Sequence, residues 1–307
     1  LGGAGVPRSP VSSMLNAEDL GYGDVSLAVA ALTPLSFIHV LLDQGDVTQQ
    51  ERYLPALADE KFVAATLAVM EPKAVFDINE LTTVAELHGD NYVLNGVKTA
   101  VALADTSKYL LVLANETSSQ KTFGFVVAAD AAGVAVSAES YMGLRSLPLQ
   151  RVTLENVQVP VSARVGDAEK GIDVQRIVDL GRIGLGALAV GCCQAMLDYV
   201  VPYVNERTAF GEPISHRQSV AFMVADMAIE LEAMRMLVYR AASRAESGMD
   251  FHRDAYHVHL LCSEKAMQIG TNGIQLLGGH GFVREHPVEM WYRNLRAISI
   301  MQGLALI

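Results

Sequence analysis

The chain reads Arg207-Thr208-Ala209-Phe210-Gly211-Glu212-Pro213-Ile214-Ser215-His216-Arg217-Gln218 between two long apolar segments. The segment before it, residues 172–203, is interrupted only by scattered polar residues, and the apolar residues after it recur at helical spacing. Phe210-Gly211 followed by Pro213 does not continue a helix, because glycine has no preferred helical conformation and proline lacks the N–H donor. The stretch is therefore predicted to be a turn between two helices.

This turn carries two arginines and a glutamine. A guanidinium group binds phosphate through paired hydrogen bonds, and a carboxamide can read the edge of a heterocyclic base. The residues alone leave two interpretations open, a helix-capping turn or a site for an anionic diphosphate that is attached to a heterocycle.

A second motif, Gln275-Leu276-Leu277-Gly278-Gly279-His280-Gly281-Phe282, follows a helical pattern that starts at about Phe251. The glycine cluster predicts the end of that helix and lets another backbone or a phosphate come close. The two motifs together resemble the acyl-CoA dehydrogenase family. Six further motifs follow the family's order: Glu51-Arg52-Tyr53-Leu54-Pro55, Met70-Glu71-Pro72, Leu94-Asn95-Gly96-Val97-Lys98, Met142-Gly143-Leu144-Arg145, Val157-Gln158-Val159-Pro160 and Trp291-Tyr292-Arg293-Asn294-Leu295-Arg296.

The resemblance implies an α+β fold with three parts. These are the tail of an N-terminal helical domain whose first helices are absent (1–60), a central β-barrel domain (61–166) and a C-terminal four-helix bundle with an oligomer interface (167–307). The apolar pattern fits this division, with helical spacing over 11–42, short strands from 62 to 154 and long helices from 171. Asn95-Gly96 predicts a hairpin turn, because both residues tolerate positive φ. Residues 1–10, rich in glycine and proline, predict a connector.

Composition excludes several classes of partner. With 307 residues, 51% hydrophobic, the chain can bury a large core. A formal charge of -11 disfavours nucleic acid and anionic membranes. No uninterrupted apolar stretch reaches the ~18 residues of a membrane-spanning helix, because Asp179, Arg182 and Asp198 break the most hydrophobic region. A soluble protein is therefore predicted.

The cysteines and histidines predict no metal site. Three cysteines, Cys192, Cys193 and Cys262, lie in apolar helical context and are interpreted as reduced core thiols of a cytoplasmic protein. His257 and His259 fall on different helical faces, so these residues and His252 are interpreted as surface histidines. The first residue is Leu1 rather than methionine, which we interpret as missing N-terminal residues rather than a targeting signal.

The resemblance implies a reaction in which a carboxylate removes the α-proton of an acyl-CoA thioester while the β-hydrogen leaves as hydride to FAD. Most family members carry this base in a Tyr-Glu-Gly segment, which here reads Met301-Gln302-Gly303. Glutamine cannot accept a proton at neutral pH. The family's second base position, one residue before Arg182, is Gly181. Neither position offers a carboxylate, so no catalytic residue is assigned.

The residues that match the family's contacts to the isoalloxazine ring also differ. Met70 stands where the family has a hydroxyl residue, and Val75 and Phe76 replace small residues, which predicts crowding of the ligand cleft. Ala100 replaces an aromatic residue that stacks on the flavin, and Ala102 replaces a second hydroxyl residue. A single engineered Glu→Gln change would not explain these five departures.

The motifs that hold the nucleotide part of FAD are retained. In the family these groups reach across a dimer interface to the FAD of the neighbouring subunit. The matching residues are Arg207, Thr208, Phe210, Arg217, Gln218, Gln275, Leu276, Gly278 and Gly279. This combination resembles paired acyl-CoA dehydrogenases, heterotetramers with two copies of each of two subunits and one FAD per pair, which are associated with bulky acyl chains including steroid side chains.

The first hypothesis is therefore a subunit without its own catalytic base that completes the FAD site of a partner subunit, with an acyl-CoA substrate and electron-transfer flavoprotein as acceptor. The second is a homotetrameric acyl-CoA dehydrogenase in which the catalytic glutamate has been changed to Gln302. The third is a flavin-free structural or binding protein of the same fold.

Overall fold

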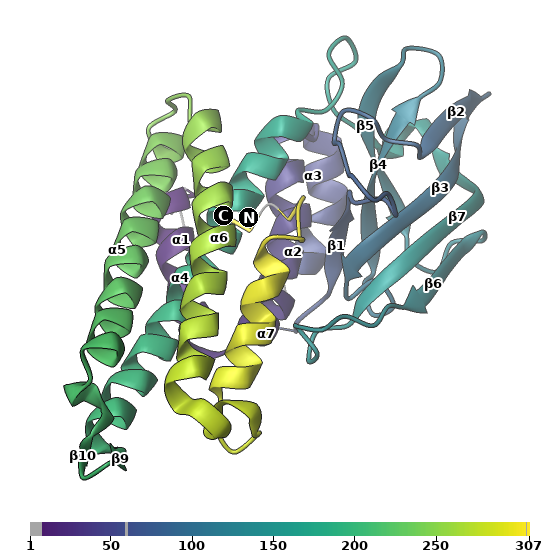
Figure 1. The fold of residues 1–307 in the computed structure, drawn as a ribbon. Helices are drawn as coiled ribbons and strands as arrows, with labels where there is room; N and C mark the ends of the chain where they lie inside the picture. Colours follow the sequence, from purple (N-terminus) through teal and green to yellow (C-terminus); the bar gives the residue numbers. More distant parts are fainter. Residues whose placement is uncertain (1–7, 59–60, 305) are drawn as a thin grey trace.

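The computed structural model describes residues 8–58, 61–304 and 306–307. Helices precede and follow the central β domain in the sequence, and in space they lie together on one side of it (Figure 1). The N-terminal helices are α1 (Pro10–Gly23), α2 (Val25–Gln44), α3 (Val47–Tyr53) and the 3-10 turn η1 (Pro55–Leu57). Asp24 separates α1 from α2 and caps α2 by accepting a hydrogen bond from the Leu27 N–H. The expected pair of helices is confirmed, whereas the predicted connector lies mostly outside the described residues and Pro10 already starts α1.

The central β domain is confirmed. Its strands are β1 (Ala65–Ala68), β2 (Val84–His88), β3 (Asn91–Ala102), β4 (Tyr109–Glu116), β5 (Lys121–Ala128), β6 (Val134–Ala138), β7 (Leu149–Pro160) and β8 (Arg164–Val165), with the 3-10 turn η2 (Val161–Ala163) before β8. The ladder runs in the order β6-β7-β3-β2-β4-β5-β8, and β1 pairs with β4. Pairing is antiparallel except for β1–β4 and β2–β4.

The predicted hairpin at Asn95-Gly96 is wrong. Both residues lie inside β3, where the register with β7 shifts between Leu94 and Gly96, which marks a bulge. The turn between β2 and β3 is Gly89-Asp90 instead, since His88 pairs with Asn91. Glycine is needed at position 96 for a different reason, because its φ is 155° and an added Cβ would lie 2.6 Å from Thr83 Oγ1.

The C-terminal part is helical, as predicted. Its helices are α4 (Val174–Glu206), α5 (Gln218–Glu246), α6 (His252–Leu277) and α7 (Val288–Ile298). The stretch after α4 contains the short strands β9 (Thr208–Ala209) and β10 (Glu212–Pro213) and the 3-10 turn η3 (Ile214–His216), and α6 is followed by the 3-10 turn η4 (Gly278–Phe282). The predicted break between two helices and the glycine end of α6 are therefore confirmed.

Two helices, α2 and α4, are long and apolar enough to cross a membrane by length and composition. The expectation that no stretch of the sequence is apolar enough to span a membrane was therefore wrong. In α2 and α4 respectively, 67% and 78% of the most apolar window is buried inside the fold, which is typical of core helices.

The three cysteines are buried, unpaired thiols, as predicted. Burial raises the pKa of Cys262 to about 12, so this thiol stays protonated at neutral pH. Among the described residues, no group of three or more His, Cys, Asp and Glu side chains is arranged to hold a metal ion. His252 and His257 are exposed, but His259 is half-buried, so the surface interpretation holds for only two of the three histidines.

Candidate functional site

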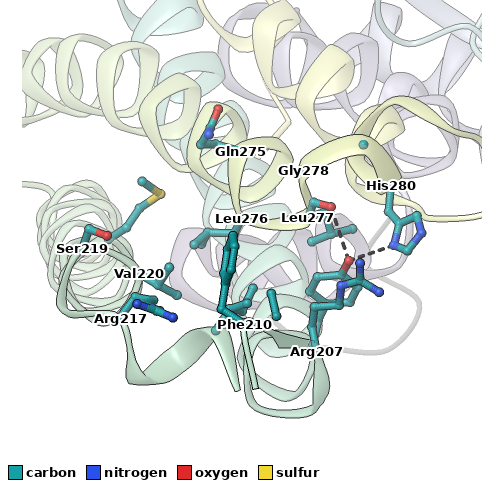
Figure 2. A pocket seen from close by; sticks show the side chains of 15 residues that line it. Arg207, Phe210, Arg217, Ser219, Val220, Gln275, Leu276, Leu277, Gly278 and His280 are labelled. Atoms are coloured by element: carbon teal, nitrogen blue, oxygen red, sulfur yellow. Dashed lines mark hydrogen bonds between the residues drawn. The ribbon is translucent and has the colours of Figure 1, made fainter. Parts of the chain in front are cut away.

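A cavity of about 840 Å³ opens where the end of α4, the 208–216 turn, the start of α5 and the end of α6 meet. Two segments that are far apart in the sequence, the turn after α4 and the glycine cluster after α6, form its walls (Figure 2). A cavity of this size lies within the range of roughly 300 to 1,000 Å³ that is usual for small-molecule sites. We call it the nucleotide pocket.

The structure brings seven of the nine predicted cofactor residues together in the nucleotide pocket. They are Arg207, Phe210, Arg217, Gln275, Leu276, Gly278 and Gly279. Thr208 and Gln218 do not belong to the lining, because Thr208 lies on β9 with its exposed side chain outside the cavity and Gln218 is the first residue of α5.

The lining of the nucleotide pocket contains no carboxylate, so its charged groups are cationic. Arg217 is partly neutralised, because it pairs with Glu212 at 3.2 Å and its guanidinium lies 5.6 Å from the centre of the Phe210 ring. The ion pairs of the described residues do not include Arg207. Arg207 is therefore an exposed cation that is available to an anionic ligand or to a neighbouring chain.

The backbone of the pocket is strained where the sequence predicted contacts. Phe210 has a φ of 56° and its side chain is 95% exposed, an arrangement that costs free energy without burying the ring in this chain. Gly278 has a φ of 57°, and a Cβ added at Gly278 or Gly279 would meet no atom within 4 Å. The packing of the described chain therefore leaves open space beside both glycines and around Phe210.

The pocket residues that were not assigned from the sequence include Tyr203 and His280. Tyr203, from the last turn of α4, donates a hydrogen bond to the Leu277 carbonyl at 3.3 Å, and its oxygen lies 2.8 Å from His280 Nδ1 (Figure 2). The position of His280 directly after Gly279 was a usable signal, whereas the approach of Tyr203 depends on how α4 and α6 pack.

The two base positions of the family lie close together. The Gln302 N–H donates to Met70 Sδ at 3.3 Å, and a Cβ added at Gly303 would lie 2.6 Å from Val69 Cβ. A Cβ added at Gly181 would lie 2.5 Å from the Leu304 carbonyl oxygen. Gly181 therefore permits the close approach of the 301–304 segment to α4, and a side chain does not fit there.

Of the five residues expected at the isoalloxazine ring, Ala100 lines a small cavity. An apolar cavity between β3, the 141–149 segment and the end of α7 has a volume of about 50 Å³ and is lined by Ala100, Met142, Arg296, Ile300 and Met301, among others. Glu139 holds one wall by accepting hydrogen bonds from the Ala100 N–H at 2.9 Å and the Tyr141 hydroxyl at 2.8 Å. We call this cavity the ring position.

The prediction that Val75 and Phe76 together crowd the ligand cleft is not confirmed. Val75 is 83% exposed and points into solvent, so it does not fill a cleft, and Phe76 packs against the core. Met70 is the residue of this segment that reaches the Gln302 backbone. Ala102 is fully buried and therefore presents no group to a ligand.

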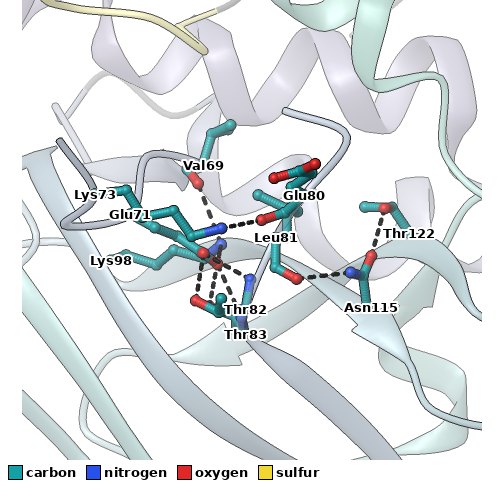
Figure 3. Close-up of polar contacts among 10 residues, drawn as sticks. All are labelled: Val69, Glu71, Lys73, Glu80, Leu81, Thr82, Thr83, Lys98, Asn115 and Thr122. Carbon is teal, nitrogen blue, oxygen red and sulfur yellow. Dashed lines mark hydrogen bonds and ion pairs between the residues drawn. The ribbon is translucent and has the colours of Figure 1, made fainter. Parts of the chain in front are cut away.

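Beside Met70 lies a buried ion pair that fixes the same segment (Figure 3). Glu71 and Lys98 are 3.0 Å apart, and both side chains are fully buried. Burial opposes ionisation of Glu71, but Lys98 and hydrogen bonds from the side chains and backbones of Thr82 and Thr83 outweigh it and hold the pKa of this carboxyl at about 2. Burial lowers the pKa of Lys98 to about 8, although Glu71 opposes this shift. Neither group opens onto a cavity, so the pair is structural.

The two cavities differ in whether they fit FAD. The nucleotide pocket fits a diphosphate and a base, since it offers an unpaired arginine, a glutamine carboxamide and a glycine backbone open to close approach. The ring position does not fit a tricyclic ring, because its volume of about 50 Å³ is far below the roughly 300 Å³ of the smallest usual ligand pockets. The two places lie at opposite ends of α7, whose 11 residues span roughly 16 Å.

Comparison with known proteins identifies the family. Sequence profiles of the acyl-CoA dehydrogenase N-terminal, middle and C-terminal domains match residues 1–61, 66–157 and 170–305. The 3-(aryl)acrylate reductase of Clostridium sporogenes is 33% identical over 98% of this chain and 81% of its own length. The caffeyl-CoA reductase-Etf complex subunit CarC of Acetobacterium woodii is 34% identical over 87% of this chain and 72% of its own.

Among solved structures, the FAD complex of PigA superimposes with a TM-score of 0.91 and 26% identity, over 98% of this chain and 81% of that one. The N-terminal helices, central β domain and C-terminal helices are thus the acyl-CoA dehydrogenase fold. The chain belongs to the acyl-CoA dehydrogenase family of FAD-dependent oxidoreductases that act on CH–CH bonds.

Proposed function

We propose that this chain is a half-site subunit of a heteromeric acyl-CoA dehydrogenase, which contributes nucleotide-binding groups to an FAD whose ring is seated in a different subunit. The observation that carries the proposal is the contrast between the two ends of α7. The nucleotide pocket is large, open and cationic, whereas the ring position of the same chain is a narrow apolar cavity.

The exposure of the pocket's groups supports a neighbour on this face. Phe210, in the pocket lining, is 95% exposed, and Phe282, at the end of η4 and outside the lining, is 85% exposed. Aromatic side chains of this size bury a large apolar area when they pack, so two that stay in water mark a surface that another chain or ligand covers. Arg207, exposed and without an ion pair, lies on the same face.

The lack of a base supports a dependence on the partner. Gln302 accepts no proton at neutral pH, and Gly181 has no space for a side chain beside Leu304. The lining of the ring position likewise contains no carboxylate. In this proposal the partner subunit supplies the carboxylate that removes the substrate proton, while this chain binds and orients the cofactor's nucleotide end.

The proposal includes two further partners. The substrate is an acyl-CoA thioester, with a bulky or steroid side-chain acyl group as the class to test first. The electron acceptor is an electron-transfer flavoprotein, a choice supported by the relative that is named as a subunit of a caffeyl-CoA reductase-Etf complex.

The test is the composition of the native assembly. The chain is expressed alone and together with a candidate partner of the same fold, and the native mass and the flavin absorbance per chain are measured. We expect no stoichiometric flavin in the chain alone and one FAD per pair of unlike chains in the complex. One FAD per chain in the absence of a partner would refute the half-site function.

The second candidate is a homotetrameric acyl-CoA dehydrogenase in which the catalytic base has been changed. The similarity to a relative of the same family over nearly the whole chain favours this candidate. It is tested by Gln302→Glu, assayed as reduction of an artificial electron acceptor by a panel of acyl-CoA thioesters. We expect no turnover with this chain as the only subunit, because Met70 and the narrow ring position still exclude the flavin. Recovered turnover would favour the second candidate over the first.

A further inference from the structure

We propose that the cleft between the end of α5 and the start of α6 is a second anion site, which binds the phosphate group of a small molecule. The inference does not depend on the proposed half-site function, because this cleft is separate from the nucleotide pocket. Both cavities border α5, but the 14 residues from Met223 to Leu237 separate them, a rise of roughly 21 Å along the helix. The two helices are joined at the end of the bundle opposite β9 and β10 (Figure 1).

The cleft, which we call the arginine cleft, has a volume of about 450 Å³. Arg240 and Arg244 line it from α5, and Arg253 and His257 line it from α6. The two residues of each pair are four positions apart and therefore share one face of their helix. The full lining is Leu237, Arg240, Arg244, Asp250, Arg253, Asp254 and His257.

The carboxylates of the arginine cleft already have partners. Asp254 lies between two guanidinium groups, with Oδ1 2.8 Å from Arg240 Nε and Oδ2 3.0 Å from Arg244 Nε. Asp250 accepts a hydrogen bond from the His252 N–H at 3.1 Å, and its carbonyl accepts two from Arg244, at 2.9 and 2.7 Å. Three arginines against two aspartates give the lining a formal charge of +1 with a neutral histidine, whereas the whole chain carries -11.

Three side chains of the cleft keep hydrogen-bond donors without a partner among the described residues. Arg240 uses its Nε for Asp254, which leaves the two terminal nitrogens of its guanidinium. Arg253 and His257 are exposed and make no hydrogen bond or ion pair with another described residue. A neutral imidazole has one N–H in either tautomer, so His257 is a donor whichever of its nitrogens carries the hydrogen.

The number of free donors favours phosphate over a carboxylate as the ligand. A phosphate monoester carries about 1.5 to 2 negative charges at neutral pH and has three terminal oxygens, one for each of Arg240, Arg253 and His257. A carboxylate has one charge and two oxygens. The volume lies within the range of roughly 300 to 1,000 Å³ that is usual for small-molecule sites, and Leu237 gives the cleft an apolar wall. The phosphate is therefore either free or carried by a small organic molecule.

The test is a titration of the purified chain with inorganic phosphate, followed by phosphorus NMR at low salt and about pH 8, where phosphate is a dianion. We expect saturable binding that Arg253→Gln weakens about tenfold or more, the loss expected for one charge-assisted contact. Arg253→Lys keeps the charge and should retain most of the affinity. Acetate should displace phosphate only at a concentration about tenfold higher or more, because it has fewer charges and oxygens.

Phenyl phosphate distinguishes the two sources of the phosphate group. Tighter binding of phenyl phosphate than of inorganic phosphate supports a phosphorylated organic molecule, whose apolar part packs on Leu237. Equal or tighter binding of inorganic phosphate supports free phosphate as the ligand of the same site.

Two further variants locate the bound phosphate. Arg145→Gln changes an exposed arginine outside both cavities and should leave the affinity unchanged. Arg207→Gln removes the unpaired cation of the nucleotide pocket and should leave the binding that depends on Arg253 unchanged. Equal thermal unfolding temperatures of the parent and Arg253→Gln chains exclude a folding effect.

The assignment would be overturned by phosphate binding that Arg253→Gln leaves unchanged or that Arg207→Gln abolishes. Displacement of phosphate by an equal concentration of acetate would overturn it as well, since the cleft would then not select phosphate. The same holds if the parent chain binds no phosphate under these conditions. The half-site function is decided separately by flavin content per chain, so the two proposals can fail independently.

Discussion

At the scale of single residues, the fold of this chain depends on a charge that is buried without access to solvent. The carboxylate of Glu71 is stabilised by Lys98 and by Thr82 and Thr83, and the segment that it holds carries Met70 to the Gln302 backbone. Removing one partner of a buried ion pair leaves an uncompensated charge in the interior. This lowers the free energy of unfolding much more than the loss of a surface ion pair does.

We expect Glu71→Gln to lower the free energy of unfolding at neutral pH by about 3 to 5 kcal/mol, because Lys98 loses its counter-charge. Glu264→Gln, in which the glutamate is 75% exposed and pairs with Lys265, is the control and should change stability by less than about 1 kcal/mol. Chemical denaturation measures both. Equal stability of the two variants would contradict the role given to the buried pair.

The same residue predicts a dependence on pH. The pKa of Glu71 is about 2 in the folded chain and lies below its ordinary value of 4.5, so the unfolded state binds more protons between these values. The stabilisation is therefore complete above about pH 4.5 and is lost as the pH falls toward 2. Acid unfolding of Glu71→Gln should show a smaller loss of stability over this window than the parent chain.

Arg207 is the residue on which the proposed nucleotide contact depends. We expect Arg207→Ala to lower the FAD occupancy of the assembled complex, because a charge-assisted contact to phosphate contributes about 1.5 to 3 kcal/mol, or roughly ten- to hundredfold in affinity. Arg253→Ala, an exposed arginine on α6 outside the nucleotide pocket, is the control. Flavin absorbance per complex is measured, and the same content in both variants would mean that Arg207 only caps the end of α4.

At the scale of elements, β3 shows how one glycine sets the course of a strand. The bulge at Gly96 lets β3 pass Thr83, which in turn donates to Glu71. We expect Gly96→Val to destabilise the fold by about 1 to 3 kcal/mol, because the new side chain overlaps Thr83 in a backbone conformation that favours glycine.

The control for this prediction is Gly89→Ala in the turn between β2 and β3. Gly89 has a φ of 60° but meets no atom within 4 Å, so only the backbone cost of about 1 to 2 kcal/mol is expected. Thermal unfolding compares the two variants. A larger loss for Gly89→Ala than for Gly96→Val would show that the contact with Thr83 is not what requires glycine at position 96.

At the scale of the whole molecule, α5 presents an apolar face that no other part of the described chain covers. Phe222, Ile229 and Met236 are 59%, 66% and 57% exposed and are spaced seven residues apart, so they share one face. A stripe of this kind is typical of an interface with another subunit.

We therefore expect Ile229→Arg to reduce the native mass of the assembly without unfolding the chain, because a charge replaces an apolar contact at a subunit interface. Val75→Arg, at a residue of the β domain that is 83% exposed, is the control and should leave the mass unchanged. Light scattering gives the mass and circular dichroism the helix content. An unchanged mass in Ile229→Arg would place the interface elsewhere.

The sequence by itself determined the features that depend on neighbouring residues. Glycine and proline that occur close together predict a helix end, so the sequence predicted the break between α4 and α5 and the glycine end of α6, as well as the apolar helices that bury the cysteines. Single prolines are less decisive, because Pro34 lies inside α2 and Pro202 inside α4. The family motifs also allowed the residues of the nucleotide pocket to be named before two distant segments were seen to form it. The bulge in β3 could not be predicted from the sequence, because the pair Asn95-Gly96 can occur in a hairpin turn as well as inside a strand.

Only the tertiary structure decided which residues far apart in the chain meet. It placed Val75 in solvent, brought the Gln302 backbone to Met70, closed Gly181 against Leu304 and set Tyr203 beside His280. None of these contacts follows from local preference, because each depends on the packing of elements separated by tens or hundreds of residues. The same packing leaves the ring position narrow while the nucleotide pocket stays open. Bulky side chains such as Met142, Ile300 and Met301 line the space between β3 and α7, whereas Gly278 and Gly279 after α6 and the outward-facing Phe210 in the turn after α4 border the nucleotide pocket.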